Sequence, residues 1–353
     1  MLQAKPRSRI ALAAIDRFCR DILAACGANP ATVDAATRGM MHGTRYGIDS
    51  HGVRLLPHYV RGLEGGRLNK RPAPQTVSAF GAVETLDADN AHGALAAYTA
   101  MDRATGLADR YGIGAVAIRN TSHFGPAGAY SIHAARQGFI GLTFCNSDSF
   151  VRLHQGAMRF HGTNPIAVGV PVENGDPWLL DMATSAIPYN RVLLYRSLDQ
   201  ALPEAVASDK AGIDTPDPRS VEMLAPLGGD FGFKGAALAG LAEILSAVLT
   251  GMKLSFDIDP MPGPDFSKPR GMGAFVMAVK PEAFLDRETF VAGMKRYLET
   301  LRSSPTREGG HVMAPGDREW TEAARRDAEG VELDPQTLES FAVLANQYRV
   351  AMP

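Results

Sequence analysis

The sequence predicts a mixed α/β protein that is helical near both ends, and three observations support this class. Apolar residues recur at helical spacing through the first 75 residues and again in the polar-faced tail over 315–350. Between these parts, short apolar runs alternate with turn residues, which is typical of strands. Two such runs, 165–170 and 178–181, enclose the turn Glu173-Asn-Gly-Asp-Pro177, which predicts a hairpin and antiparallel pairs in the sheet.

Three helices are expected before residue 75. The first carries an apolar stripe over 15–26, and the second begins with an Asn-Pro cap and runs over 30–46. Asp49 or Ser50 is expected to cap the third. Pro57 either kinks that helix, or ends one turn and starts another.

The remaining elements follow from the change of period after residue 72. In order, we expect a strand over 76–86, a helix over 94–111, strands over 114–118 and 140–144 with a glycine-containing loop and a helix between them, the hairpin, a helix over 236–249, a strand over 274–279, a helix over 287–301 and two helices in the tail. The very apolar stretch 235–252 is interrupted by Glu243 and by glycines, which favours a buried helix over a membrane span.

Composition excludes several classes of protein. The chain has 353 residues, enough for about two domains. Its 36 basic and 38 acidic residues give a net charge of −2, which does not suit nucleic-acid binding. Three cysteines are too few for a disulfide framework, and the apolar run 10–15 is too short for an export signal, so we expect a cytoplasmic protein. No metal-binding spacing of His or Cys occurs, and no metal is expected.

Nucleotide motifs are incomplete in this sequence. Gly112-Ile-Gly114 enters a predicted strand, whereas the dinucleotide fingerprint follows a strand and opens a helix. The segment Gly229 to Gly235 places glycines and Lys234 where a helix begins, and the free amides of a helix start favour an anion such as a phosphate; an ordinary flexible start of the helix is the alternative.

Two histidines occur in positions that suit catalysis. Ser50 and His51 are adjacent on a predicted helix start, which rules out a Ser/His nucleophile pair and leaves His51 as a proton donor or as an ordinary capping residue. His123 lies in a glycine-containing turn between a strand and a helix, where catalytic groups are common. Polar turns at Thr163 and after Asp181 have similar positions at strand ends.

With these motifs in order, the sequence resembles the type 2 malate/L-lactate dehydrogenase family, which includes ureidoglycolate, sulfolactate and diketogulonate dehydrogenases and the reductases of Δ1-piperideine- and Δ1-pyrroline-2-carboxylate. The matching pieces span nearly the whole chain: Asp49-Ser-His-Gly52, Ser122-His-Phe-Gly125, Gly162-Thr-Asn-Pro-Ile-Ala167, Asp181-Met-Ala-Thr-Ser185, Leu202-Pro-Glu204, Gly229 to Gly235 and Pro315-Gly316.

The resemblance implies a fold, a partner and a set of site residues. It implies an α/β (α+β) protein with a non-Rossmann cofactor domain and a mixed, largely antiparallel sheet over 76–299, a helical domain made of 1–75 with 300–353, and a homodimer. Either His51 or His123 is the implied proton donor, with Ser50 and Thr163 facing the substrate. The implied cofactor-binding residues are His123, Phe124, Gly125, Asp181, Met182, Ala183, Lys234, Gly310, Pro315 and Gly316.

Two departures from the family pattern concern the substrate. The family usually reads His-Gly-x-x-Arg, whereas Arg54 here stands one position earlier, about 100° around a helix. The ketimine reductases carry an aspartate where this chain has Arg191, and Arg191 could instead hold a carboxylate.

The sequence therefore predicts an enzyme that uses NAD or NADP to interconvert a small 2-oxo acid and its 2-hydroxy acid. The alternative is a reductase of cyclic ketimine carboxylates. A protein that binds the cofactor without turnover is a third, remote reading.

Overall fold

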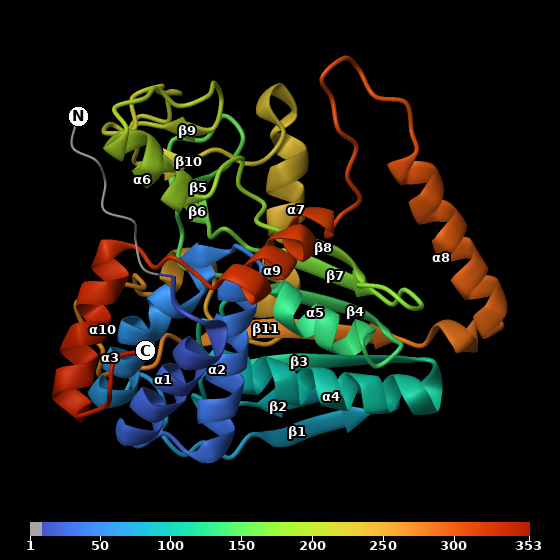
Figure 1. Ribbon diagram of the computed structural model, residues 1–353, viewed down its shortest axis with the longest axis horizontal. Coiled ribbons are helices and arrows are strands. Elements are labelled where there is room, and N and C mark those ends of the chain that lie inside the picture. Colours follow the sequence, from blue (N-terminus) through green and yellow to red (C-terminus); the bar gives the residue numbers. More distant parts are fainter. Residues whose placement is uncertain (1–8) are drawn as a thin grey trace.

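The computed structural model describes residues 9–353 as a seven-stranded sheet with helices on one face, a cluster of helices at one end and a small second sheet (Figure 1). The strands of the large sheet are β1 (Gln75–Phe80), β2 (Val83–Asp87), β3 (Ile113–Thr121), β4 (Ile140–Cys145), β7 (Ile166–Val170), β8 (Trp178–Met182) and β11 (Met272–Val279). Their spatial order is β1-β2-β3-β11-β4-β7-β8, and only β2 and β3 pair in parallel.

The hairpin of β7 and β8 confirms the turn signal in the sequence: the two strands pair antiparallel from Ile166–Met182 to Val170–Trp178. The single strand expected over 76–86 is wrong, because Gly81 adopts a φ of +56° and turns the chain back, so that β1 and β2 form a second hairpin.

The N-terminal helices are α1 (Leu12–Ala25), α2 (Pro30–Arg45) and α3 (Leu56–Gly65). As predicted, the Asn29 side chain caps α2 by accepting from the amide of Thr32 at 2.8 Å. Asp49 and Ser50 do not cap α3. They belong to a 3-10 turn over Asp49–His51, which a second turn over Val53–Leu55 follows, and α3 begins near Pro57.

One apolar core joins the two ends of the chain. Side chains of α1, α2 and α3 pack against Phe341 and Leu344 of α10 (Pro335–Tyr348), and Ile10 pairs with Val331 in an isolated bridge. Figure 1 shows α1, α3 and α10 together beside the large sheet. The division into domains at residues 75 and 300 stays a prediction.

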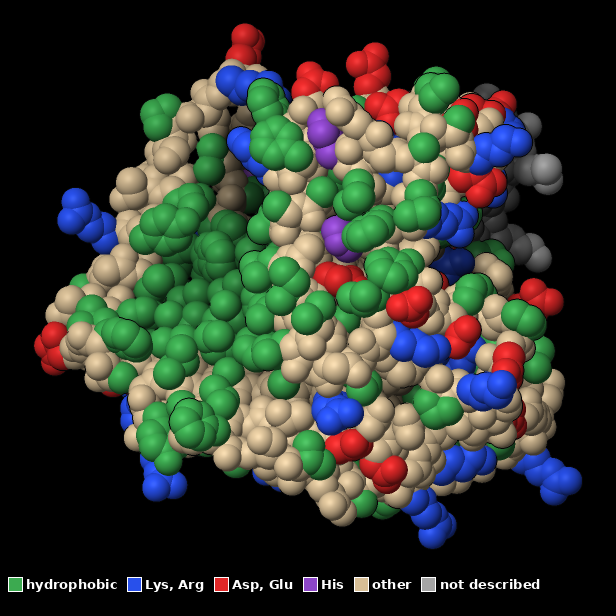
Figure 2. Space-filling view, turned by 180° about the vertical axis from the view of Figure 1, so that it is seen from behind, with side chains coloured by type: hydrophobic (Ala, Val, Ile, Leu, Met, Phe, Trp, Pro, Cys, Tyr) green, Lys and Arg blue, Asp and Glu red, His purple; other side chains and the backbone are tan. Residues whose placement is uncertain are grey.

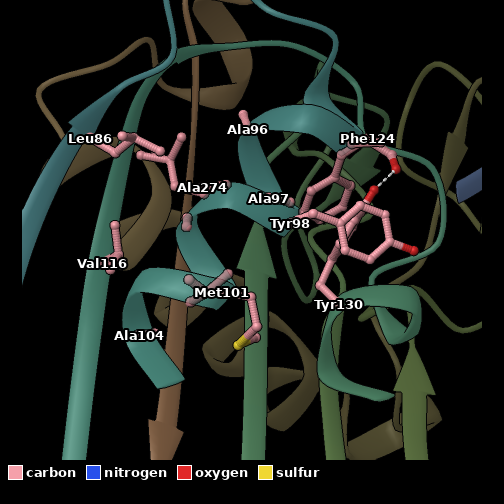
Figure 3. Close-up of a cluster of buried hydrophobic side chains, with 14 of the residues drawn as sticks. Leu86, Ala96, Ala97, Tyr98, Met101, Ala104, Val116, Phe124, Tyr130 and Ala274 are labelled. Atoms are coloured by element: carbon pink, nitrogen blue, oxygen red, sulfur yellow. Dashed lines mark hydrogen bonds between the residues drawn. The ribbon is translucent and has the colours of Figure 1, made fainter. Parts of the chain in front are cut away.

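A second core lies between the large sheet and the helices α4 (Gly93–Tyr111) and α5 (Gly128–Ala135). Alanines of α4 let it approach the sheet closely, and larger side chains such as Met101 and Tyr130 fill the remaining space (Figure 3). The Tyr130 hydroxyl donates to the carbonyl of Phe124, so this core also anchors the loop that follows β3 (Figure 3).

The other face of the sheet is only partly covered. α7 (Phe233–Glu243) continues into a π-helical turn over Ile244–Val248, and Ala242 packs on Phe144 and Phe275 of the sheet. The expected buried helix over 236–249 is wrong in its burial, because Leu241, Ile244, Val248 and Leu249 are between 45% and 62% exposed. Figure 2 shows a broad hydrophobic area on this side of the molecule, seen from behind Figure 1.

The remaining elements form the small sheet and the C-terminal helices. The small sheet orders β6 (Arg159–His161), β5 (Val151–Arg152), β10 (Met223–Leu224) and β9 (Ala207–Ser208), and the helices are α6 (Tyr189–Ser197), α8 (Arg287–Arg302) and α9 (Asp317–Glu329). Within residues 9–353, no helix is both long and apolar enough to cross a membrane.

Candidate functional site

The two histidines singled out in the sequence meet in space. His51 ends the 3-10 turn that follows α2, and His123 lies in the loop after β3. Their rings stack at an interplanar angle of 21°, with centroids 5.6 Å apart. A contact between residues 72 positions apart in sequence requires both loops to be held in place. Different contacts hold each of the two loops.

The turn that carries His51 is held by close packing and by a buried arginine. A Cβ at Gly52 would lie 2.5 Å from the Thr44 hydroxyl oxygen, so only glycine fits there. Arg326 of α9 donates to the carbonyl of Thr44 at 2.6 Å and to both carboxylate oxygens of Asp49 at 2.5 and 3.0 Å. The C-terminal part of the chain therefore fixes the turn that ends at His51.

The loop that carries His123 passes closely over the start of α4. A Cβ at Gly93 would approach the carbonyl carbon of His123 to 2.7 Å, so this position also requires glycine. Gly125 adopts a φ of +77°, which lets the chain leave the loop and begin α5.

Hydroxyl groups hold both imidazoles at Nδ1. The Ser50 Oγ lies 2.8 Å from His51 Nδ1, and the Tyr59 hydroxyl of α3 lies 2.9 Å from His123 Nδ1. A hydroxyl can donate to a ring lone pair or accept from a ring N–H. Each ring can therefore keep its Nδ1 partner while its Nε2 gains or loses a proton.

Burial keeps these imidazoles neutral near neutral pH. It lowers the pKa of His51 to about 4, and it lowers the pKa of His123 well below the usual value, with the nearby His51 adding to the shift. The positive charge of Arg270 acts on His123 in the same direction. A neutral ring can take the hydroxyl proton of a 2-hydroxy acid, whereas donation in the reverse direction requires the protonated ring, which low pH favours.

Arg270 is a buried cation that sequence reasoning missed. It precedes β11, is 2% exposed, forms an ion pair with Asp148 and donates from Nε to the Asp259 carbonyl at 2.9 Å. Tyr59 and His92 were missed as well: the His92 ring packs edge-on against Tyr59, with centroids 4.1 Å apart. Tyr59 followed the helical apolar stripe and His92 lay in a turn-rich segment, so neither carried a signal of its own.

A second group of predicted residues lines a cavity of about 300 Å³ between β8 and the start of α9. Asp181, Pro315 and Gly316 border it. Gly316 has a φ of +100°, and a Cβ there would lie 2.6 Å from the Trp320 indole nitrogen, so this position at the rim requires glycine. The hollow suits part of an elongated cofactor.

The carboxyl group of Asp181 is set at the first turn of α5. It accepts from the Gly128 amide at 3.0 Å, and a Cβ at Gly128 would lie 2.6 Å from the same oxygen. Burial raises the pKa of Asp181 to about 7, although the Gly128 N–H opposes this shift. Asp181 can therefore be a hydrogen-bond donor or an acceptor near neutral pH.

Thr163 belongs to a hydrogen-bonded group of loops. Its carbonyl accepts from the amide of Thr184 at 2.9 Å, and its amide donates to Ser147 Oγ at 3.2 Å. The next residue, Asn164, donates to the buried carboxylate of Glu243 in α7 at 2.8 Å. Asn164, Ser147 and Glu243 were not predicted, because the bonds join segments far apart in sequence.

Four predicted residues lie outside these groups. Arg54 is exposed and donates to Gln336 of α10 at 3.3 Å, and Arg191 is exposed on α6. Lys234 is exposed in the first turn of α7, where its ammonium lies 5.3 Å from the Phe231 ring centroid. Gly310 lies in the loop between α8 and α9, with its amide bonded to the Arg307 carbonyl.

The predicted neighbours of His123, namely Phe124 and Gly125, are buried.

The titratable side chains of residues 9–353 contain no group of three or more His, Cys, Asp or Glu that could hold a metal ion. Met182 ends β8 next to Asp181, and Ala183 follows the strand; both residues are partly exposed.

Comparisons with known proteins point to one enzyme family. The family model described as malate/L-lactate dehydrogenase matches residues 10–342. The malate dehydrogenase of Pyrococcus abyssi is 36% identical over 268 residues, which is 73% of this chain and 72% of that protein. The Δ1-pyrroline-2-carboxylate/Δ1-piperideine-2-carboxylate reductase of Pseudomonas syringae pv. tomato is 28% identical over 97% of each chain. The crystal structure of malate dehydrogenase from Entamoeba histolytica superposes with a TM-score of 0.92 at 27% identity, covering 98% of this chain and 99% of that one.

Proposed function

Because the chain belongs to the malate/L-lactate dehydrogenase family, we propose that it interconverts a small 2-oxo acid and its 2-hydroxy acid with NAD or NADP. Membership of this family makes the chain an oxidoreductase. The observation that carries the proposal is the stacked pair of His51 and His123, each held at Nδ1 by a hydroxyl group.

The pair accounts for the proton in this reaction. When bound, the nicotinamide supplies a hydride to C2 of the 2-oxo acid, and the carbonyl oxygen then needs a proton. A protonated His51 or His123 delivers that proton from Nε2 and becomes neutral. The hydroxyl of Ser50 or Tyr59 accepts the remaining N–H at Nδ1 and holds the ring in position. In the reverse direction, the neutral ring removes the hydroxyl proton of the 2-hydroxy acid.

The cofactor is assigned to the cavity between β8 and α9. This assignment is supported by the hollow itself, which Asp181, Pro315 and Gly316 border, and by Met182 and Ala183, which follow Asp181 in the chain. The large sheet has one parallel pair and no glycine fingerprint at a strand end, which supports a non-Rossmann mode of binding. Lys234 and Gly310 remain proposed contacts at the outer part of the cofactor.

The substrate carboxylate requires a cation or several donors. Arg54, Arg191 and Thr163 stay the residues that the sequence proposes for this role. The buried Arg270, whose charge reaches His123, is a further candidate supplied by the fold.

A ketimine substrate is the alternative, because a relative named for reducing cyclic imine carboxylates matches almost the full chain. One assay separates the two readings. Oxidation of NADH and NADPH is followed at 340 nm with pyruvate, oxaloacetate, sulfopyruvate, Δ1-pyrroline-2-carboxylate and Δ1-piperideine-2-carboxylate. We expect turnover with a linear 2-oxo acid. Activity confined to the cyclic imines would transfer the function to the alternative, and the two cofactors report the NAD or NADP preference directly.

A homodimer is proposed through the exposed apolar face. Leu241, Ile244, Val248 and Leu249 leave α7 and its π turn unusually apolar for a solvent-facing surface, and hydrophobic side chains extend over this side (Figure 2). Ile244→Glu should convert the dimer to a monomer in light scattering, whereas Leu198→Glu, at an exposed site directly after α6, serves as the control. The three free cysteines are buried, which supports a cytoplasmic location.

A further inference from the structure

A second cavity opens on the helical side of the molecule, and neither His51 nor His123 lines it. Its volume is about 620 Å³, within the range of small-molecule sites. Residues of α2 and α5 form its walls, and residues of α1 and α9 border it. Its lining shares no residue with the cavity beside Asp181.

Positive charge exceeds negative charge in this cavity. Four arginines line it: Arg17, Arg38, Arg45 and Arg136. The two lining carboxylates are already engaged, because Asp16 accepts from Arg20 at 2.7 Å and Asp327 accepts from Arg45 at 2.8 and 3.1 Å. Within the described chain, Arg17 and Arg136 form no ion pair. Two guanidinium groups are therefore left for an anion from outside.

Tyrosine residues hold three of the four guanidinium groups in defined positions. The Tyr46 hydroxyl accepts from Arg136 at 2.8 Å and from Arg45 at 3.0 Å. The Arg38 guanidinium stacks on the Tyr98 ring, 4.1 Å from its centroid, and its nitrogen atoms lie 3.4 Å from His133 Nδ1 and 3.7 Å from the Asp34 carboxylate, so its neighbours hold it in place. The cations are thus arranged before any ligand arrives, which lowers the cost of binding.

The cavity also offers apolar surface and an unused polar atom. Met41 and Ile132 contribute apolar side chains to its wall. The Nε2 atom of His42, another lining residue, is buried and has no hydrogen-bond partner among the described residues. A ligand that fits this wall has an apolar or aromatic body next to its charge.

We propose that this cavity binds a small organic dianion, with its anionic group held by Arg17 and Arg136 and its apolar body against Tyr98 and Ile132. A phosphate monoester and a dicarboxylate share this chemistry. The site bridges two helices that lead to the catalytic region: α2 runs into the turn of His51, and α5 begins directly after the loop of His123. The anion held by Arg17 and Arg136 therefore joins α1 to the end of α5, the helix that follows the loop of His123.

Calorimetric titration of the full-length protein tests the site, with phenyl phosphate and phthalate as probes and benzyl alcohol as the neutral control. We expect one dianion per chain and retention of binding when NADH is present at saturation. Arg17→Gln and Arg136→Gln should each weaken binding about tenfold, because each removes a charge-assisted hydrogen bond. Arg219→Gln is the matched control, since Arg219 is an exposed arginine that pairs with Asp199 outside the cavity.

Some outcomes of the titration identify the class of ligand, and others overturn the proposal. If phenyl phosphate binds and phthalate does not, the ligand is a phosphate monoester. If both probes bind, the site recognises the two negative charges and does not distinguish phosphate from carboxylate. Displacement by NADH, equal binding of benzyl alcohol, or the same loss in Arg219→Gln would overturn the proposal, as would the absence of heat with both dianions. Arg17 is exposed and unpaired, so its substitution leaves folding intact, and an unchanged Tm checks this.

Discussion

The raised pKa of Asp181 gives a quantitative prediction for stability. Its carboxyl group has a pKa of about 7 in the folded chain and 3.8 as the reference value. The folded state therefore binds a proton more tightly than the unfolded state, and the free energy of unfolding falls as pH rises until the folded pKa is passed. Asp181→Asn removes this titration, and asparagine can still accept from the Gly128 amide.

The expected loss of unfolding free energy follows from the pH range over which only the folded carboxyl group holds its proton. Within the measured range this runs from pH 5.5 to the folded pKa of about 7, a span of about 1.5 pH units that corresponds to about 2 kcal/mol. Asp181 keeps some contact with solvent, and we therefore expect about half of this, ~1 kcal/mol. The wild-type protein should lose this much relative to Asp181→Asn as the pH is raised.

Urea denaturation at pH 5.5 and pH 8.5, without cofactor, measures the difference. Asp199→Asn is the control, because the Asp199 side chain is 80% exposed and its removal should change stability equally at both pH values. We subtract the free energy of unfolding of Asp181→Asn from that of the wild type. If this difference were the same at both pH values, or larger at pH 8.5, the assignment of a raised pKa to Asp181 would be refuted.

Four further results are expected from the proposed chemistry. His51→Ala and His123→Ala should each lower kcat by about 100-fold or more in the 340 nm assay, and a near-normal rate in either variant would remove that residue from proton transfer. Tyr59→Phe, which deletes the Nδ1 partner of His123, should lower kcat by about tenfold, with Tyr111→Phe at an exposed site as the control. Lys234→Ala should raise the Kd for NADH or NADPH with little change in kcat; an unchanged Kd in fluorescence titration would exclude a phosphate contact. Because the pKa of His51 is about 4, kcat/KM for reduction should rise about tenfold for each unit of falling pH between 8 and 5, whereas a flat profile would contradict a histidine donor.

Local chemistry in the sequence predicted much of the fold. The Asn29 cap and the turn before Pro177 act over a few residues, and both appear as expected. The position of β11 between β3 and β4 could not be inferred, because it depends on pairing over more than 120 residues. The exposure of Ile244 also lay beyond the sequence, since an apolar run looks the same whether it packs inside its own chain or against another surface.

The sequence predicted some residues of the candidate site and missed others. His51 stood out beside Ser50 at a predicted helix start, and His123 stood out in a glycine-containing turn between a strand and a helix. The family resemblance added their chemistry. Tyr59 carries no such mark, since a buried tyrosine in an apolar stripe is usually a core residue. Arg326 holds Asp49 from 277 positions away, and only the three-dimensional structure reveals that bond.

The clamp of Arg326 on the turn of His51 also has a consequence during synthesis. A ribosome delivers the chain from its N-terminus, so His51 emerges long before α9 exists. Until Arg326 arrives, Asp49 and the Thr44 carbonyl lack the partner that fixes the turn. The turn of His51, and with it the proposed proton-transfer pair, therefore gains its last hydrogen bonds only when the chain is nearly complete, long after both histidines are made.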